Sequence, residues 1–274
     1  MDTSAFEEME QSGWAKSTIA QGYATRFANA TKLVADHLSD AVAPVNDRHI
    51  LDLCTGHGVV ASALASRGAK VKGLDFSPAM VALAESQVPD VQFVVGDAMA
   101  LESDDSVFDA VTIGFGVPHL PDPHAGLAEV ARVLKPGGRL AFSIWQGKGS
   151  TGGFGWLFEA YDLYGDPAVI LPSGPDAHAF ADNDFAKSEL EGLGFSSVTS
   201  SVVAATLVID APEHLFDAYD QGAVRAAALL SGQSESRRAD VRAHMAENVR
   251  AHASKIQDSW HVPVPVAVVS AILD

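Results

Sequence analysis

The pattern of apolar and polar residues changes from helical spacing to short apolar runs near residue 45. An apolar run at residues 49–54 ends in the turn at 55–58, and a helix-like stretch follows at 59–65. Four further runs predict strands at residues 70–75, 91–95, 108–113 and 139–144. This regular alternation of strand and helix predicts a parallel sheet with helices on both faces.

Helices are expected where apolar residues recur at helical spacing or where a capping residue precedes a proline. Ser77-Pro78 and Asp122-Pro123 each combine a side-chain cap with proline at the first helical position. Gly137-Gly138 is expected to end the second of these helices. Outside this region, helices are predicted at residues 17–38, 185–193, 214–230 and 237–252, and strands at 198–209 and 262–273.

These elements predict an α/β fold, with a doubly wound, Rossmann-like sheet of seven mostly parallel strands and helical lid insertions. We expect the 274 residues to form a single domain. Its expected parts are an N-terminal helical cover at 1–40, a ligand-binding core at 45–145, lid insertions at 146–182 and 211–258, and the rest of the core at 183–210 and 259–274.

The composition limits the partners of the chain. The formal net charge is −17, and no run of Lys or Arg provides a local exception, so no nucleic-acid partner is expected. Cys54 is the only cysteine, which excludes an internal disulfide and a thiol-ligated metal site and fits a reducing, cytoplasmic compartment. No metal is expected, and a homodimer is left open beside a monomer.

The sequence gives no indication of membrane insertion. Residues 1–11 lack the basic and then apolar pattern of a secretory signal. The longest apolar stretch, at 262–273, is interrupted by prolines and is shorter than the roughly 20 residues that cross a bilayer. We therefore expect a soluble protein without integral membrane contact.

The turn after the first predicted strand has the chemistry of a nucleotide-type ligand site. Gly56, Gly58 and Ala61 match the spacing G-x-G-x-x-A of dinucleotide-binding folds. Asp75 ends the second predicted strand, where a carboxylate can accept hydrogen bonds from ribose hydroxyls. These features suit a dinucleotide and S-adenosyl-methionine equally well.

Two further acids favour S-adenosyl-methionine. Asp52 lies just before the glycine turn, where it disfavours a pyrophosphate but suits a ligand that carries a sulfonium and an ammonium group. Asp97 closes the third strand, where its carboxylate can accept from an adenine amino group. Phe76 has two interpretations, which are a cover for the adenine ring and ordinary core packing.

An ordered set of four motifs resembles the class I S-adenosyl-methionine-dependent methyltransferases, closest to the ubiquinone/menaquinone-biosynthesis type. The resemblance covers residues 48–145 and lies in the segment 52–58, Asp75, Gly96-Asp97-Ala98 and the segment 108–140. It implies that the loop residues Cys54, Gly56, His57 and Gly58 hold the methionine part of the cofactor. It also implies that Asp75 binds the ribose, Asp97 and Ala98 the adenine, and that Gly114 lies against the cofactor.

The chain departs from this family's pattern at three places. Cys54 occupies the first glycine position of the loop acid-x-Gly-x-Gly-x-Gly, and His57 occupies a position often held by a smaller residue. Pro118-His119 stands where the quinone enzymes typically carry an Arg-Asn pair. The resemblance therefore implies the fold and cofactor but not quinone specificity.

Candidate residues for the acceptor side are a histidine and several aromatics. His119 lies just past the fourth strand, where ligands of open α/β sheets collect, and is either a catalytic base or a cap for the turn at Asp122. Trp14, Tyr23 and Trp156 are candidate substrate residues because aromatics crowd the predicted covers; the alternative is core packing.

The resemblance implies methyl transfer to a small, apolar or aromatic acceptor at O, N or C by in-line displacement, leaving S-adenosyl-homocysteine. Positioning alone can lower such a barrier by roughly 7–11 kcal/mol, so few catalytic side chains are needed. The alternatives are an NAD(P)-dependent oxidoreductase, which leaves Asp97 and the motif at 134–138 unexplained, and a non-catalytic S-adenosyl-methionine-binding regulatory protein.

Overall fold

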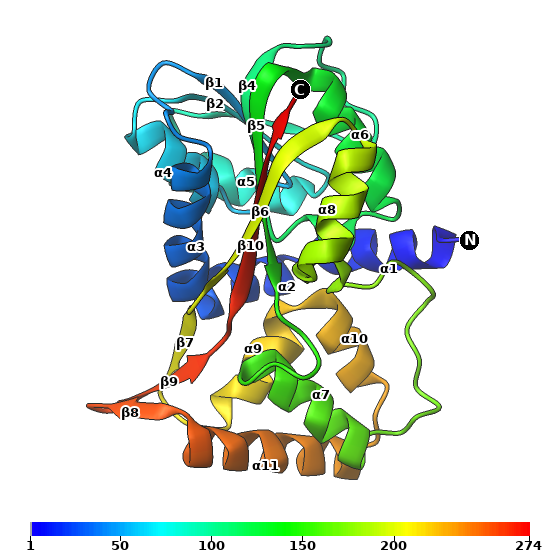
Figure 1. Ribbon diagram of the computed structural model, residues 1–274. Helices are drawn as coiled ribbons and strands as arrows, with labels where there is room; N and C mark the ends of the chain where they lie inside the picture. The colour runs from blue at the N-terminus through cyan, green and yellow to red at the C-terminus, as the bar shows by residue number, and fades with distance from the viewer. Residues whose placement is uncertain (1) are drawn as a thin grey trace. The chain divides into compact units, whose positions relative to one another are not determined.

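The computed structural model describes residues 2–274, which form two compact units (Figure 1). The larger unit comprises Thr31–Ile144, Pro175–Val203 and Val266–Asp274. The smaller unit comprises Met1–Ala30, Trp145–Gly174 and Ala204–Pro265, although Met1 itself lies outside the described residues.

The larger unit is built on a seven-stranded sheet in the order β3-β2-β1-β4-β5-β10-β6. The first five strands in the chain, β1 (His49–Leu53), β2 (Lys70–Asp75), β3 (Gln92–Val95), β4 (Phe108–Gly114) and β5 (Leu134–Trp145), pair in parallel. The last two, β6 (Phe195–Val203) and β10 (Val266–Leu273), pair antiparallel with each other. The predicted seven-stranded, mostly parallel sheet is confirmed.

Helices cover both faces of this sheet (Figure 1). They are α3 (Ala28–Ala41), α4 (Val59–Ser66), α5 (Pro78–Gln87), α6 (Pro123–Val133) and α8 (Asn183–Gly192), with short 3₁₀ turns η1 (Val117–His119) and η2 (Ala179–Ala181). One core cluster joins the strands to α6 and α8, and a second joins Ala61 of α4 and Ala84 of α5 to Phe93 of β3. Both predicted caps are confirmed, since Ser77 accepts from the Met80 N–H and Asp122 from the Ala125 N–H.

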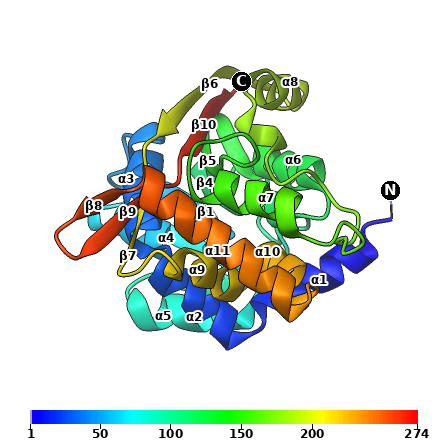
Figure 2. The ribbon, with the colours of Figure 1, turned by 90° about the horizontal axis from the view of Figure 1, so that it is seen from below.

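The smaller unit contains six helices and a three-stranded sheet among its described residues. The helices are α1 (Ser4–Trp14), α2 (Ser17–Arg26), α7 (Gly153–Tyr164), α9 (His214–Gly222), α10 (Val224–Ser231) and α11 (Glu235–His252). The antiparallel strands β7 (Thr206–Ile209), β9 (Ser259–Pro263) and β8 (Ser254–Ile256) form the sheet in that order. The long helix α11 contacts α7 and α9, and α9 in turn contacts α2 (Figure 2).

Two predicted single helices are each a pair of helices in the structure. The helix expected at 17–38 is interrupted at Phe27, whose fully buried ring packs against Tyr23, Trp145 and Tyr219. The helix expected at 214–230 is interrupted at Ala223, which has the extended values φ −132° and ψ 114°. At Phe27, tertiary packing of the aromatic ring therefore overrides the helical periodicity of the segment.

Three predicted strand boundaries are also corrected. The closing strand expected at 262–273 is divided between β9 and β10, and the β-rich segment 198–209 is divided between β6 and β7, because β7 pairs with β9 instead of with the large sheet. Gly137-Gly138 does not end α6, which stops at Val133 as Leu134 pairs with Phe108 and begins β5.

The segments of the smaller unit overlap the predicted insertions but have different bounds. Most of α3 belongs to the larger unit, and Phe180 of η2 lies in the core cluster of that unit, whereas the predicted covers 1–40 and 146–182 include both. The pairing of β7 with β9 extends the third segment beyond the predicted 211–258. A covering role for these segments stays a prediction.

Across residues 2–274, no helix is long and apolar enough to cross a membrane.

Candidate functional site

The glycine turn between β1 and α4 combines left-handed backbone with an open side. Cys54, Gly56 and Gly58 have φ values of 54°, 55° and 85°. A Cβ on Gly58 would lie within 3.4 Å of Ala84, Phe93 and Val88, whereas a Cβ on Gly56 would have no atom within 4 Å. Gly58 is therefore required for close packing of the turn, and Gly56 faces the space where a ligand can approach the backbone.

Asp52 supports this turn from below. Its side chain is 0% exposed. One carboxylate oxygen accepts from the Thr112 hydroxyl at 2.9 Å, and the other accepts from the Thr55 hydroxyl at 2.6 Å and the Ala61 N–H at 3.1 Å. Because these protein groups surround the carboxylate, Asp52 supports the turn, and its predicted contact with the cofactor stays a prediction. Sequence reasoning missed Thr55 and Thr112, which only the fold brings to Asp52.

Burial of Asp52 makes the stability of the folded protein depend on pH. Desolvation raises this pKa from its usual 3.8 to about 6, and the charge of Asp75 adds to the rise. Because the folded state then binds more protons than the unfolded state, the stability contributed at this site falls as the pH rises from about 3.8 to about 6.

We expect Asp52→Asn to abolish this part of the pH dependence. The free energy of unfolding of the variant, relative to the parent, should rise by on the order of 3 kcal/mol between about pH 4 and about pH 7. Urea denaturation of both proteins across this range measures the difference, and subtraction removes the titration of the other acids. A difference that does not vary with pH would contradict the buried, ionisable Asp52.

Asp75 connects the glycine turn to the start of α5. Its two carboxylate oxygens accept from the N–H groups of Gly56 and Ser77, each at 2.9 Å. Burial raises the pKa of Asp75, while these two hydrogen bonds and the nearby charge of His119 lower it. Each carboxylate oxygen can accept a further hydrogen bond, so Asp75 can bind a ligand and hold the turn at once.

The predicted site residues that follow β3 and β2 differ in how far they are buried. Asp97 is exposed, and its carboxylate accepts from the Met99 N–H at 2.8 Å. The methyl group of Ala98 packs in the core cluster, so an adenine contact of this residue would be made by its backbone. Phe76 is half-buried.

His57, in the glycine turn, is 6% exposed. Burial lowers its pKa to about 4, so its imidazole is neutral at pH 7.

Cys54 and Gly116 form a complementary pair that sequence reasoning missed. A Cβ on Gly116 would lie 2.3 Å from the Cβ and 2.7 Å from the Sγ of Cys54. The absence of a side chain at Gly116 therefore makes room for Cys54 at a position that the related loop fills with glycine. Cys54 also has a left-handed conformation, which is uncommon for a residue with a side chain.

The pKa of the Cys54 thiol shows that three carboxylates lie near the turn. The pKa of Cys54 is raised first by burial and then by the charges of Asp75, Asp52 and Asp97. These three carboxylates end adjacent parallel strands, as the sequence predicts, and their potential overlaps at the turn. The raised pKa keeps the thiol protonated, and the negative potential suits a cationic ligand.

The turn after β4 brings His119 to the same edge of the sheet. A Cβ on Gly114 would lie 3.0 Å from Val60 of α4. Phe115 has a φ of 61°, and its N–H donates to the Ser143 hydroxyl at 3.0 Å. Non-glycine residues with positive φ tend to gather at functional sites, and both Cys54 and Phe115 occur here. His119 follows on η1, close enough for its charge to act on Asp75.

The three predicted substrate aromatics do not form one group. Trp14 and Tyr23 meet edge to face at a centroid distance of 5.5 Å, and the Trp14 indole N–H donates to Glu10. Trp156 lies apart on α7, 5% exposed, with its ring 6.1 Å from that of His252 on α11. Trp156 packs between helices, and a substrate role for it stays a prediction.

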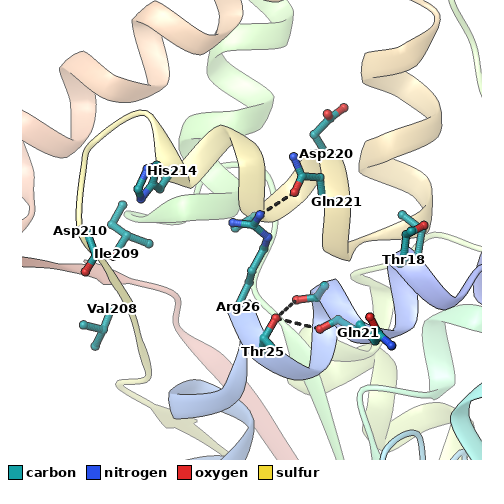
Figure 3. A pocket seen from close by; sticks show the side chains of 13 residues that line it. Thr18, Gln21, Thr25, Arg26, Val208, Ile209, Asp210, His214, Asp220 and Gln221 are labelled. Carbon is teal, nitrogen blue, oxygen red and sulfur yellow. Dashed lines mark hydrogen bonds between the residues drawn. The ribbon is translucent and has the colours of Figure 1, made fainter. Parts of the chain in front are cut away.

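A groove of about 770 Å³ lies between α2, the end of β7 and α9 in the smaller unit (Figure 3). Two of its polar side chains already bond within the protein, since Arg26 donates to the Gln221 side chain and the Thr25 hydroxyl donates to the Gln21 carbonyl. None of the predicted site residues lines it. In the described part of the chain, no group of three or more His, Cys, Asp or Glu residues is arranged to hold a metal ion.

Comparison with known proteins identifies relatives of this chain. Residues 51–142 match a family model described as "Methyltransferase domain", which spans the predicted cofactor residues and His119. The chain is 36% identical over 184 residues to a demethylmenaquinone methyltransferase of Clavibacter sepedonicus, covering 61% of this chain and 74% of the relative. It is 45% identical over 183 residues to the enzyme of the same name from Beutenbergia cavernae, covering 60% and 75%.

A solved structure extends the similarity of the fold along the whole chain. A phosphoethanolamine N-methyltransferase of Haemonchus contortus, in complex with phosphomonomethylethanolamine and S-adenosylhomocysteine, superimposes with a TM-score of 0.59. The alignment covers 98% of this chain and 60% of that protein at 18% identity. At this identity the likeness concerns the fold, and the site must be judged from its own residues.

Proposed function

Because the chain belongs to the class I S-adenosyl-methionine-dependent methyltransferases of the menaquinone type, we propose that it methylates an apolar aromatic ring that bears oxygen. Phenols and hydroquinones are the acceptor class. The relatives from Clavibacter and Beutenbergia are named for demethylmenaquinone, which supports a quinone-type acceptor. The Pro118-His119 pair, in place of Arg-Asn, indicates that the preferred ring differs from theirs.

The observation that carries the proposal is the open backbone at Gly56 in a turn where three carboxylates converge. Gly56 leaves space above the turn, and Asp52, Asp75 and Asp97 concentrate negative potential there. When bound, S-adenosyl-methionine supplies an electrophilic methyl group on a sulfonium. Its positive charges fit this potential, whereas a dinucleotide pyrophosphate would be repelled by it.

The residues of the larger unit divide the task of holding the cofactor. In this proposal, Asp75 accepts from the ribose hydroxyls, Asp97 and the backbone of Ala98 bind the adenine, and Phe76 covers the ring. His57 and the Gly56–Gly58 backbone hold the methionine part, with Gly114 alongside. The acceptor gains the methyl group and releases a proton, which His119 takes up as the base.

The test of this function combines cofactor binding with an acceptor panel. Titration calorimetry should detect S-adenosyl-homocysteine at micromolar affinity and no heat from NAD or NADP. Incubation with methyl-labelled cofactor and a panel of phenols, naphthohydroquinones and amines should label the oxygen-bearing rings, and analysis of the product identifies the methylated atom. Binding of NAD without binding of the sulfur nucleoside would overturn the proposal, and cofactor binding without any label transfer would favour a regulatory protein.

We expect His119→Gln to lower turnover by about a hundredfold, the low end of general-base contributions, and to remove the limb of the pH–rate profile that a general base produces. Its affinity for S-adenosyl-homocysteine should change less than about twofold, because the base acts on the acceptor. His124→Gln is the matched control, since His124 lies on α6 in an exposed ion pair with Glu189. A parental pH profile in His119→Gln would make His119 a structural residue.

A further inference from the structure

The smaller unit contains an aromatic cluster of Tyr23, Phe27, Trp145, Phe154 and Tyr219. The Phe27 ring centroid lies 5.2 Å from Tyr23, 5.7 Å from Trp145 and 5.9 Å from Tyr219. The Phe154 ring centroid lies 5.6 Å from Trp145 and 4.7 Å from Tyr219. The five rings thus form one continuous apolar cluster, contributed by α2, the residue after α2, the end of β5, α7 and α9.

Within this cluster, Tyr219 carries a buried polar atom with no partner. Its side chain is 0% exposed, and its hydroxyl makes no hydrogen bond to any of the described residues. Burial raises the pKa of this phenol well above its usual range, so the group is a neutral donor. A buried donor without a partner lowers stability, and folded proteins retain few of them. Tyr219 therefore calls for an explanation that packing alone does not provide.

The hydroxyl lies against the N-terminus of α7. A Cβ on Gly153 would be 2.4 Å from the Tyr219 hydroxyl, and the next atoms belong to the apolar side chains of Val264 and Leu215. The N-cap position is Gly152, which has no side chain to cap the helix. The first N–H groups of a helix have no partner within it and carry the positive end of its dipole. Hydrogen-bond donors are therefore concentrated at one point beside the apolar cluster.

We propose that the Tyr219 hydroxyl and the N-terminal N–H groups of α7 recognise an oxygen atom of the acceptor, while the aromatic cluster packs against its ring. The inference rests on the proposed methyl transfer and adds the group that selects the acceptor. A phenolic or carbonyl oxygen accepts from these donors, whereas a hydrocarbon ring leaves them unpaired and an ammonium group is repelled by the helix terminus.

The segment before α7 controls access to this subsite. A Cβ on Gly152 would lie 2.1 Å from the Pro263 carbonyl, and one on Gly155 would lie 1.8 Å from the Ser150 carbonyl. These glycines allow the segment to close directly on neighbouring backbone and cover the hydroxyl. Gly149 and Gly152 have positive φ values of 84° and 141°, which glycine adopts readily. The acceptor ring enters when this segment opens.

Tyr219→Phe is the decisive variant because it removes only the hydroxyl. The probes are 2-naphthol and naphthalene, titrated by tryptophan fluorescence with and without S-adenosyl-homocysteine. The parent should prefer 2-naphthol, and Tyr219→Phe should lose about tenfold of that preference, the equivalent of one hydrogen bond. The variant should keep its affinity for S-adenosyl-homocysteine and for naphthalene, and its melting temperature should stay level or rise.

Tyr161→Phe is the matched control in the same unit. The Tyr161 hydroxyl is fully paired, since it bonds to the carbonyls of Asp166 and Val169 and accepts from Gln233. Its removal should lower the melting temperature and leave the preference for 2-naphthol unchanged. The two tyrosines should therefore give opposite results, which a general effect of losing a phenol cannot produce.

Two outcomes overturn the subsite. One is a Tyr219→Phe protein with a higher melting temperature and parental affinity for 2-naphthol, which would make the hydroxyl an unsatisfied group without a ligand. The other is a parent protein that binds S-adenosyl-homocysteine but neither ring. A parent protein that does not bind S-adenosyl-homocysteine would instead contradict the proposed function. This result distinguishes failure of the proposed function from failure of the subsite.

Discussion

Asp75→Ala is expected to weaken the binding of S-adenosyl-homocysteine by roughly ten- to more than a hundredfold, because hydrogen bonds to a charged group contribute about 1.5–3 kcal/mol each. The carboxylate holds the N–H groups of Gly56 and Ser77, so its removal loosens the glycine turn as well as removing acceptors for the ribose. Titration calorimetry measures the affinity, and circular dichroism establishes that the variant is folded.

Asp109→Ala is the matched control for this experiment. Asp109 lies at the opposite end of the sheet, near the start of β4, where its carboxylate accepts from the His49 N–H and pairs with Lys135. These bonds lower its pKa despite the opposing desolvation. Asp109→Ala should lower the melting temperature and leave the cofactor affinity unchanged. A folded Asp75→Ala protein with the parental dissociation constant would remove Asp75 from the site.

Gly56→Ala is expected to weaken S-adenosyl-homocysteine binding at least about tenfold while the protein still folds. The new Cβ meets no protein atom within 4 Å, so it points into the space assigned to the cofactor. The left-handed backbone at Gly56 adds a cost of roughly 1–2 kcal/mol for a residue with a side chain. Thermal denaturation and calorimetry separate this loss of stability from the loss of affinity.

Gly137→Ala provides the control for backbone strain alone. Gly137 also has a positive φ, 76°, and a Cβ there would likewise have no neighbour within 4 Å, but the residue lies near the start of β5. The two variants should lose similar stability, and only Gly56→Ala should lose affinity. If both bind S-adenosyl-homocysteine like the parent, the space above Gly56 is not the cofactor site.

The comparison of Gly56 with Gly58 shows how far a glycine motif can be interpreted without a fold. The sequence identifies both as members of one loop motif. The structure separates them, because Gly58 packs against α5 and β3 whereas Gly56 faces open space. Gly58→Ala should therefore destabilise the protein more than Gly56→Ala does, although both are positions of positive φ.

The sequence by itself determined the first four strands of the large sheet and the edge at which the candidate site lies. Apolar runs bounded by turns are local signals, so β1, β2, β3 and β4 were predicted to within about a residue, as were the caps Ser77 and Asp122. Asp52, Asp75 and Asp97 could be placed together from sequence because the ends of adjacent parallel strands meet at one edge.

Only the tertiary structure decided what depends on contacts between distant segments. Periodicity could not show that Phe27 interrupts a helix, because its ring packs on Trp145 and Tyr219, more than a hundred residues away. Nor could it show that β9 leaves the large sheet to pair with β7, that Thr112 buries Asp52, or that Gly116 makes room for Cys54. The unpaired hydroxyl of Tyr219 belongs to the same class, since a missing partner becomes visible only when every neighbour has been placed.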